Sequence, residues 1–275
     1  MDSELAQLRQ ALNFPDFQKL KSETEYETRM RKSGKSRTWH KIQELIELLP
    51  VSFNHVLYLT SQPNGLIYLK DSHPGFDWFL IEEWAYGRKP SWLAKKFPKR
   101  CLTGHVTTAE DIHWNNGKIW EDNEMVDFFA DILKSKSWQP DLIICDMNVI
   151  SNEEQEQEQA QITVKKAEID LCLKTLRMSG TLVIKLLGVS LPETRQLMTE
   201  ISSCFLDSNL IKLQGSNPMN SELYLICKGL NTRMINTTPA EYQKITAMCQ
   251  RQTKKQISEI KTFLLKKKDT VTTIC

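Results

Sequence analysis

The chain has 275 residues, of which 40% are hydrophobic and 25% are charged, a balance typical of a folded protein with a full core. With 36 basic and 34 acidic residues its formal net charge is only +2, so any affinity for nucleic acid must come from local clusters. The composition argues against a disulfide scaffold, a zinc site and a membrane span: the seven cysteines form no C-x-x-C pair, and no apolar run approaches ~18 residues.

The predicted elements begin with a polar N-terminal extension, residues 1–33, that carries a short helix near 3–12. Apolar residues then recur at helical spacing and predict an amphipathic helix over 36–49 that ends before Pro50. Beyond it, short apolar runs alternate with helical patterns. The predicted strands cover residues 55–60, 76–81, 101–106, 141–146, 181–185, 210–213 and 222–227, and the predicted helices cover 66–71, 122–134, 162–178 and 193–206.

This alternation predicts an α/β fold with a doubly wound, mostly parallel sheet. We expect one main domain over residues 34–230 and a helical, basic C-terminal appendage over 231–275, with its helix at 238–268. Two stretches are expected to lack a full regular element. Residues 85–100, rich in Pro, Lys and Arg, predict a loop or a broken helix, and the acidic stretch 152–161 predicts a solvated loop.

Three of the predicted strands carry a charged residue at one end. Asp146 closes Asp-Leu-Ile-Ile-Cys-Asp, Lys185 closes Gly-Thr-Leu-Val-Ile-Lys, and Glu222 opens Glu-Leu-Tyr-Leu-Ile-Cys; a fourth charge, Lys41, lies near the start of the first long helix. Burying such a charge alone is costly, and ligands of open α/β sheets bind beyond the carboxyl ends of the strands. Each residue taken singly fits a surface ion pair, but the four together favour a shared cleft.

The segments around these charges resemble a known enzyme family. Residues 36–42, Ser-Arg-Thr-Trp-His-Lys-Ile, are similar to the family's helix start, and 170–185 resembles its helix–Gly–strand unit that ends in a lysine. Residues 220–230 resemble the family's strand of the pattern S-E-x-Y-(apolar). In this order and context, the four charges resemble the K-D-K-E tetrad of the FtsJ/RrmJ-type ribose 2′-O-methyltransferases: Lys41, Asp146, Lys185 and Glu222.

Within this class, two segments have a more specific resemblance. Residues 118–121 and 141–147 look most like the methyltransferase domain of the large (L) polymerase protein of nonsegmented negative-strand RNA viruses, particularly rhabdovirus-like ones. Residues 220–230 are also similar to eukaryotic cap methyltransferases. The resemblance covers about residues 34–230 and implies that this range is a Rossmann-like, S-adenosylmethionine-dependent methyltransferase domain.

The resemblance implies methyl transfer to an RNA ribose 2′-oxygen, in the first place that of a cap-proximal mRNA nucleotide, with guanine N7 as a further acceptor. Such a reaction needs in-line positioning and help in removing the hydroxyl proton. Lys185 would be the base or the stabiliser of the alkoxide, with Lys41 as the neighbouring cation. Asp146 and Glu222 would orient the lysine. The chemical step would use no metal, and the five histidines show no metal-ligand spacing.

The implied S-adenosylmethionine contacts lie at the ends of the predicted strands and in the turn Thr-Ser-Gln-Pro-Asn-Gly over 60–65. A carboxylate at the end of the second strand is placed to accept hydrogen bonds from ribose hydroxyls. The turn departs from the family pattern G-x-x-P-G-G, because Thr60 replaces the first glycine. Its Cβ is expected to crowd the methionine part of the cofactor or to force a different backbone path. The predicted cofactor contacts are Ser61, Pro63, Gly65, Glu82, Glu83, Asp111 and Ile112.

Two alternatives to a cap methyltransferase stay open at this point. The altered turn favours a catalytically weak RNA-binding module that keeps the fold, and the tetrad fits an rRNA or tRNA ribose methyltransferase equally well. Near the tetrad lysine of the first long helix, Lys32, Lys35 and Arg37 fit a rim that follows RNA phosphates. A solvated helix start would have the same composition.

The expected partners are RNA, with a capped mRNA 5′ end in the first place, and the rest of a viral RNA polymerase. No membrane partner is expected. The N-terminal residues lack the apolar region of a signal peptide, and the cysteine pattern suits a reducing compartment. We therefore expect a cytoplasmic protein, located in the host cytoplasm or the virion if the protein is viral.

Overall fold

Strands and helices alternate along the chain in a computed structural model that describes residues 4–5, 7–8, 30, 32–49, 52–60, 62–82, 91–103, 123–147, 154–218 and 220–272. The strands are β1 His55–Thr60, β2 Asp77–Glu82, β3 Cys101–Thr103, β4 Leu142–Asp146, β5 Thr181–Leu187, β6 Phe205–Ile211 and β7 Glu222–Leu230. The helices that accompany them are α4 Arg37–Leu48, α5 Asn64–Ser72, α6 Trp92–Lys96, α7 Asn123–Ser135, α8 Glu154–Thr175, α9 Pro192–Ser202 and α10 Pro239–Thr272.

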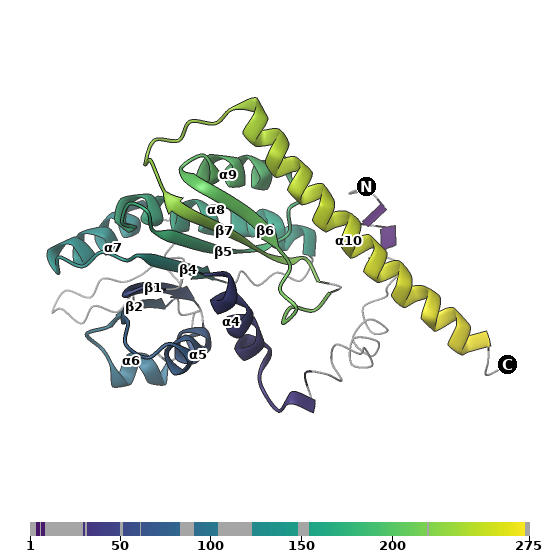
Figure 1. The fold of residues 1–275 in the computed structure, drawn as a ribbon, viewed down its shortest axis with the longest axis horizontal. Helices are drawn as coiled ribbons and strands as arrows, with labels where there is room; N and C mark the ends of the chain where they lie inside the picture. Colours follow the sequence, from purple (N-terminus) through teal and green to yellow (C-terminus); the bar gives the residue numbers. More distant parts are fainter. Residues whose placement is uncertain are drawn as a thin grey trace.

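The seven strands form one twisted sheet in the order β3-β2-β1-β4-β5-β7-β6 (Figure 1). The pairs from β3 to β5 are parallel, and β7 runs antiparallel to both of its neighbours. The chain moves outward from β1 in one direction and then returns to continue from β4 in the other, so a topological switch point lies between these two central strands. The predicted doubly wound, mostly parallel sheet is confirmed.

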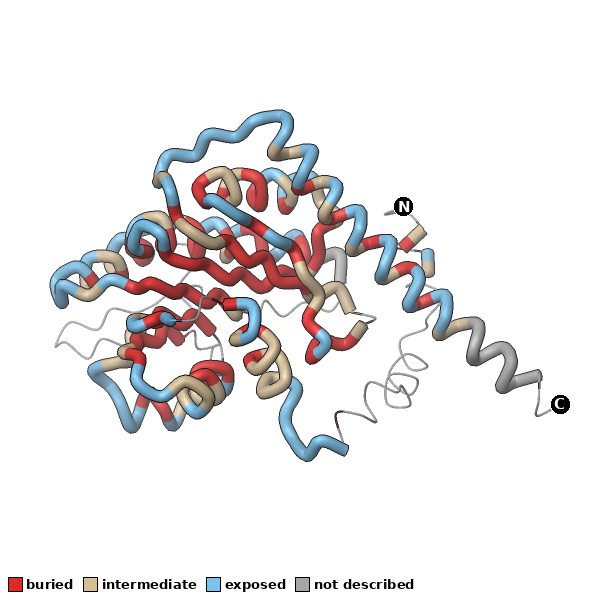
Figure 2. The backbone as a smooth tube through the Cα atoms, viewed as in Figure 1, coloured by how far each residue is buried: buried red, intermediate tan, exposed pale blue. Residues whose placement is uncertain are grey.

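Helices cover both faces of the sheet (Figure 1), and its central strands are buried between them (Figure 2). Each face has its own apolar layer. Residues such as Leu57, Ile143 and Ile184 face α7, α8 and α9, whereas Tyr58, Ile144 and Val183 face α4 and α5. Neighbouring residues of a strand point to opposite faces. The nearly continuous apolar runs of the central strands are therefore explained by burial on both sides.

The acidic stretch that was expected to be a solvated loop is the beginning of α8, and that prediction is wrong for the described part, Glu154 onward. Glu158 and Gln161 are buried, with only 5% and 1% of their surfaces exposed. Their side-chain oxygens accept the backbone N–H groups of Leu191 and Leu187, each at 2.8 Å. These polar residues are buried because their side-chain oxygens pair with backbone N–H groups at the end of β5 and in the connection that follows it.

One boundary between a helix and a strand also differs from the prediction. The helix expected over 193–206 ends at Ser202, because β6 begins at Phe205, five residues before the strand predicted near 210. The loop or broken helix expected over 85–100 agrees with the described part, which contains the short helix α6; Ser91 caps it by accepting the N–H of Ala94. Pattern reasoning locates such elements more reliably than their ends.

The C-terminal helix predicted over 238–268 is observed as α10, a single long helix that projects beyond the sheet (Figure 1). Its first half packs on α9 and β6, and its Ile245 and Cys249 join the core of that face. Farther along, Leu5 packs against Ile257 and Ile260. Within the part of the chain that the structure describes, no helix is long and apolar enough to cross a membrane.

Candidate active site

The carboxyl ends of β1, β2 and β4 meet at one edge of the sheet. Thr60, the last residue of β1, is in register with Glu82 of β2 on one side and with Asp146 of β4 on the other. On β5 and β7, Lys185 is paired with Tyr224. Because side chains alternate along a strand, Asp146 and Lys185 both point to the face covered by α4 and α5.

Lys185 and Asp146 form the central ion pair of this edge. Lys185 Nζ contacts Asp146 Oδ1 and also donates to the Asp146 carbonyl oxygen at 3.2 Å. The lysine side chain is 3% exposed and the aspartate side chain is 20% exposed. An ammonium group buried to this degree needs a carboxylate partner for its stability, because the desolvation of one unpaired ion costs on the order of several kcal/mol.

A second ion pair joins α4 to β7. Ser36 caps α4 by accepting the N–H of Trp39 at 3.1 Å, and Lys41 follows in the next turn of the helix. Its Nζ lies 2.5 Å from Glu222 Oε1. The sequence predicted that both carboxylates orient Lys185; in the structure Asp146 contacts Lys185, whereas Glu222 contacts Lys41.

The loop between β6 and β7 fixes this second pair by pressing against α4. A Cβ at Gly215 would lie only 2.7 Å from the backbone nitrogen of Lys41, so the close approach requires glycine at this position. The Glu44 carboxylate, one turn after Lys41, accepts the N–H of Gln214 at 2.6 Å. The helix and the loop are therefore held together on both sides of the lysine.

All four charged residues line one cleft, with an open volume of about 590 Å³ that is partly continuous with solvent. The side chains come from α4, from the strand ends and from the turn after β1. The lining residues are Thr38, Lys41, Ile42, Leu45, Tyr58, Thr60, Gln62, Asn64, Ile144, Asp146, Lys185, Glu222 and Tyr224. The predicted shared cleft for the four charges is therefore present in the structure.

The charge balance of the cleft is visible at Glu222. Burial alone would raise the pKa of this carboxyl, but the positive charges of Lys41 and Lys185 act against it, together with hydrogen bonds from Lys41 and Ser216. The net result lowers the pKa of Glu222 from its ordinary 4.5 to about 2. Glu222 is thus an anion at neutral pH and partly neutralises the two lysines.

This pKa predicts a specific pH dependence of stability. A carboxyl whose pKa falls on folding stabilises the protein above its unfolded pKa, and this contribution is lost as the pH drops from 4.5 to about 2. The contribution corresponds to about 3 kcal/mol. We expect the unfolding free energy of Glu222→Gln to depend less on pH than that of the wild type below pH ~5, as measured by denaturant unfolding.

The matched control for this prediction is Glu259→Gln, which removes an exposed carboxylate of α10. Its pH profile should run parallel to that of the wild type. Parallel profiles for Glu222→Gln and the wild type would contradict the assigned charge coupling.

The turn after β1 contains the predicted cofactor contacts Pro63 and Gly65, both of which are buried. Thr60, which replaces the first glycine of the family pattern, directs its hydroxyl into its own turn: Oγ1 accepts the N–H of Gln62 and donates to the Gln62 carbonyl, each at 2.9 Å. The threonine side chain therefore stabilises the turn by a local side-chain-to-backbone motif.

The residues of this edge fit S-adenosylmethionine. The N-cap residue of α5, Pro63, makes no side-chain capping hydrogen bond, and the helix begins at Asn64 in the lining of the cleft. A helix N-terminus of this kind suits a carboxylate, such as that of the methionine part. Glu82 lies buried at the end of β2, where one oxygen accepts a 2.7 Å hydrogen bond from Ser91. A carboxylate at this position suits ribose hydroxyls.

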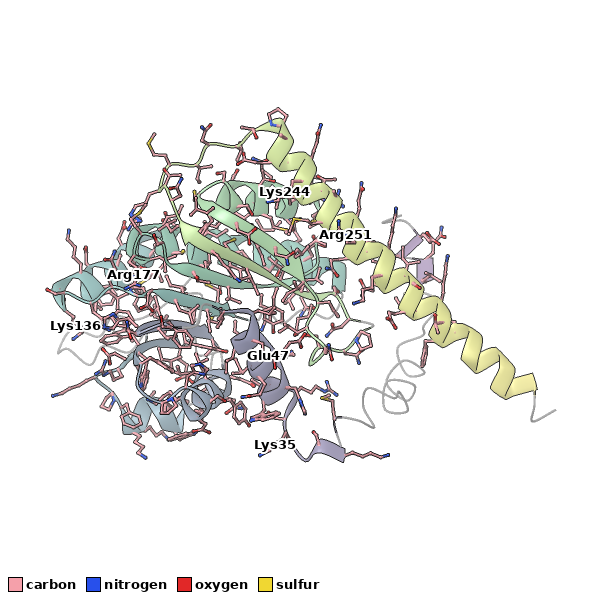
Figure 3. The ribbon with its side chains drawn as sticks, in the orientation of Figure 1. Lys35, Glu47, Lys136, Arg177, Lys244 and Arg251 are labelled. Atoms are coloured by element: carbon pink, nitrogen blue, oxygen red, sulfur yellow. The ribbon has the colours of Figure 1, made fainter. Side chains whose placement is uncertain are left out.

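The remaining predicted contacts are placed as follows. Lys32, Lys35 and Arg37 are exposed at the N-terminal end of α4, and Figure 3 shows Lys35 at this end of the helix. Lys35 Nζ lies 5.6 Å from the centre of the Trp39 ring. Four predicted cofactor contacts lie outside the described residues: Ser61, Glu83, Asp111 and Ile112.

Sequence reasoning did not identify three side chains that hold the tetrad carboxylates. Ser216 donates to Glu222 Oε1 at 2.5 Å, and Tyr224 donates to the same oxygen at 3.3 Å. Tyr58 donates to Asp146 Oδ2 at 3.3 Å. Both tyrosines lie in apolar strand runs, where the sequence pattern predicts that an aromatic residue belongs to the hydrophobic core. The available signal was the strand period of two, which puts Tyr224 on the same face as Glu222.

Known proteins are similar to this chain in sequence and in fold. Residues 98–230, a range that includes Asp146, Lys185 and Glu222, match the model of the FtsJ-like methyltransferase family, whose members use S-adenosylmethionine. The cap-specific mRNA (nucleoside-2′-O-)-methyltransferase of Autographa californica nuclear polyhedrosis virus is 35% identical over 88 residues, which are 32% of this chain and 34% of that protein. The matched region thus spans about a third of that relative.

Among solved structures, a putative ribosomal RNA methyltransferase from Plasmodium falciparum matches with a TM-score of 0.50 at 16% identity. The match covers 71% of this chain and 98% of that chain. The likeness at this identity shows the fold, and the family match adds the type of domain. The chain therefore has the fold of a methyltransferase, and its residues 98–230 are similar to the FtsJ-like methyltransferase family.

Proposed function

We propose that the protein is an S-adenosylmethionine-dependent RNA methyltransferase that methylates the ribose 2′-oxygen of a cap-proximal mRNA nucleotide. The single observation that supports it most is the buried Lys185–Asp146 pair beside the Lys41–Glu222 pair in one open cleft. The match to the FtsJ-like family and the cap-specific viral relative support the same reaction class.

Bound S-adenosylmethionine supplies an electrophilic sulfonium methyl group. The reaction forms a bond between the ribose 2′-oxygen and this methyl group while the bond between sulfur and methyl breaks, so the hydroxyl must lose its proton. Lys185 is the residue placed for that task. Two hydrogen bonds to Asp146 fix its nitrogen, and the lysine lines the cleft.

The Lys185 nitrogen has one bonding position that the hydrogen bonds to Asp146 do not occupy, and the group at this position decides the role of the lysine. In the amine form the position holds a lone pair that accepts the 2′-hydroxyl proton. In the ammonium form it holds an N–H that stabilises the alkoxide. Lys41 adds a second positive charge for the developing oxyanion, and Glu222 holds this ammonium at 2.5 Å. The carboxylates of Asp146 and Glu222 balance the positive charges of the two lysines, so the four groups together carry no large excess of charge.

For the cofactor, the first turn of α5 would hold the carboxylate of the methionine part, and Glu82 would accept hydrogen bonds from the ribose. Thr60 stabilises the intervening turn through Gln62. For the RNA, the exposed cations at the start of α4 are the proposed phosphate contacts.

We expect charge reversal of this rim to weaken RNA binding. In Lys32→Glu/Lys35→Glu, two exposed cations near Lys41 become anions, so affinity for single-stranded RNA should fall. The slope of log affinity against log salt should decrease by about 1.4, the value for two lost phosphate contacts. Fluorescence anisotropy at several salt concentrations measures both quantities.

The matched control is Lys134→Glu/Lys136→Glu, which changes the net charge equally at exposed residues near the end of α7. Figure 3 shows Lys136 at the left edge of the view and Lys35 at its bottom, so the two lysines lie on different parts of the surface. Equal losses of affinity in the two double variants would indicate a general charge effect and contradict the proposed rim.

The cap preference is tested with RNAs of one sequence that carry either a guanosine cap or a 5′-triphosphate. With labelled S-adenosylmethionine, the proposal expects methyl transfer to the capped RNA and much less to the uncapped RNA. Equal transfer would reject cap preference and leave a ribose methyltransferase of other RNAs. Transfer that persists on RNA with a 2′-O-methylated first nucleotide, with label at guanine N7, would reject the ribose as the main acceptor.

A further inference from the structure

Tyr58 is a buried residue of the cleft to which neither the family pattern nor the tetrad assigns a role. It lies in β1, two residues before Thr60, and is 1% exposed. Its ring packs in the apolar layer that includes Ile42 and Ile144, and its hydroxyl reaches Asp146 Oδ2 at 3.3 Å. Because Lys185 contacts Oδ1, the two oxygens of this carboxylate have different partners.

The same hydroxyl lies close to Gly65, in the first turn of α5. A Cβ on Gly65 would lie 1.9 Å from the Tyr58 hydroxyl oxygen and 2.7 Å from the ring carbon that bears it. Gly65 lies in the first turn of a regular helix, so its backbone conformation does not explain the glycine. The close approach of Tyr58 does. The phenol therefore lies between the turn expected to hold the cofactor and the carboxylate that holds Lys185.

The other tetrad carboxylate has a similar arrangement. Glu222 contacts Lys41 and also accepts a hydrogen bond from Tyr224 at 3.3 Å. Each carboxylate is thus held by one lysine and one buried tyrosine. Burial, reinforced by the negative charge of Asp146 and by the hydrogen bond to it, raises the pKa of Tyr58 well above its ordinary value. Tyr58 consequently remains a hydrogen-bond donor throughout the neutral pH range.

We propose that Tyr58 is a positioning residue: its hydroxyl holds Asp146 in the rotamer that engages Lys185 and connects this carboxylate to the first turn of α5. The proposal rests on the proposed function, since it assigns Tyr58 a part in placing the lysine for methyl transfer. A carboxylate whose two oxygens each have their own partner cannot rotate freely. Catalytic side chains require pre-organisation of this kind.

The test uses Tyr58→Phe, which removes the hydroxyl and keeps the ring. We expect kcat for methylation of capped RNA to fall about tenfold, the effect of losing one hydrogen bond to a charged group. The dissociation constant for S-adenosylmethionine, measured by calorimetry, should stay unchanged. Tyr242→Phe, which removes a phenolic hydroxyl on α10 outside the cleft, should keep wild-type kcat.

A double-mutant cycle with Asp146→Ala separates positioning from a general structural effect. If Tyr58 acts through Asp146, adding Tyr58→Phe to Asp146→Ala should cause no further loss in single-turnover rate. An equal loss in both backgrounds, or wild-type kcat in Tyr58→Phe, would overturn the proposal.

The same four proteins are compared by denaturant unfolding, which does not depend on activity. The proposal expects the double variant to be less destabilised than the sum of the single variants, and additive effects would overturn it. Absence of methyl transfer by the wild type would instead reject the proposed function, while the unfolding cycle would still decide whether the hydroxyl holds the carboxylate.

Discussion

Replacement of Lys185 by alanine is expected to reduce 2′-O-methyl transfer by about 10³-fold, within the range that general acid–base catalysis contributes. Lys185 is 3% exposed, lines the cleft and is fixed by Asp146, so no solvent-exposed group can replace it at the same position. Affinity for S-adenosylmethionine should change little, because the proposed cofactor contacts lie on β2, the turn after β1 and α5. Methyl transfer under single-turnover conditions and cofactor calorimetry measure the two effects separately.

Two further variants separate the possible roles of Lys185 and control for the loss of a lysine. Lys185→Arg keeps a positive charge but cannot accept a proton near neutral pH; full loss of activity in this variant would identify the lysine as a base, and substantial activity would identify it as an electrostatic stabiliser. Lys174→Ala removes an exposed lysine that pairs with Asp127 and should retain activity. Wild-type methylation by Lys185→Ala would contradict the mechanism.

The second large effect is on stability. Asp146→Ala leaves the buried ammonium of Lys185 without its carboxylate, and removal of one partner of a buried ion pair costs about 3 kcal/mol or more. The Asp146 side chain is 20% exposed, so the lower end of this range is expected. Denaturant unfolding at pH 7 gives the free energy directly.

The combination Asp146→Ala/Lys185→Met tests the origin of this loss. An apolar residue of similar length removes the unpaired charge, so stability should return toward the wild-type value while activity stays absent. As a surface control, Asp127→Ala removes one partner of the exposed Lys174–Asp127 pair and should cost less than about 1 kcal/mol. If Asp146→Ala were no more destabilising than this control, the buried pair would not have the proposed energetic role.

The sequence was sufficient to predict the sheet and the four charges at its edge, because both depend on short-range patterns. Short, nearly continuous apolar runs identify strands buried on both faces, and a charge at the end of such a run must face water or a ligand. The pairing within the tetrad depends instead on tertiary packing. β5 lies between β4 and β7, so strand order alone brings both carboxylates near Lys185. The loop before β7 packs against α4, and Glu222 contacts Lys41.

Two kinds of residue were beyond the reach of pattern reasoning for a physical reason. Tyr58 lies inside the run His-Val-Leu-Tyr-Leu-Thr and has the burial of a core residue; its hydroxyl function becomes visible only when β4 is placed beside β1. Glu158 and Gln161 lie in a Glu- and Gln-rich stretch without an apolar period. They are buried because they bond backbone N–H groups about 30 residues away in sequence.

The measurement that tests the central claim most directly compares two capped RNAs that differ in one atom, the 2′-oxygen of the first transcribed nucleotide. With the wild-type protein and labelled S-adenosylmethionine, the RNA with a 2′-hydroxyl should gain one methyl group, and nuclease digestion should locate it on that ribose. The RNA with a 2′-deoxy nucleotide should gain none. Equal labelling of the two RNAs, or no labelling of either at saturating cofactor, would contradict assignment of the cleft to ribose 2′-O-methylation.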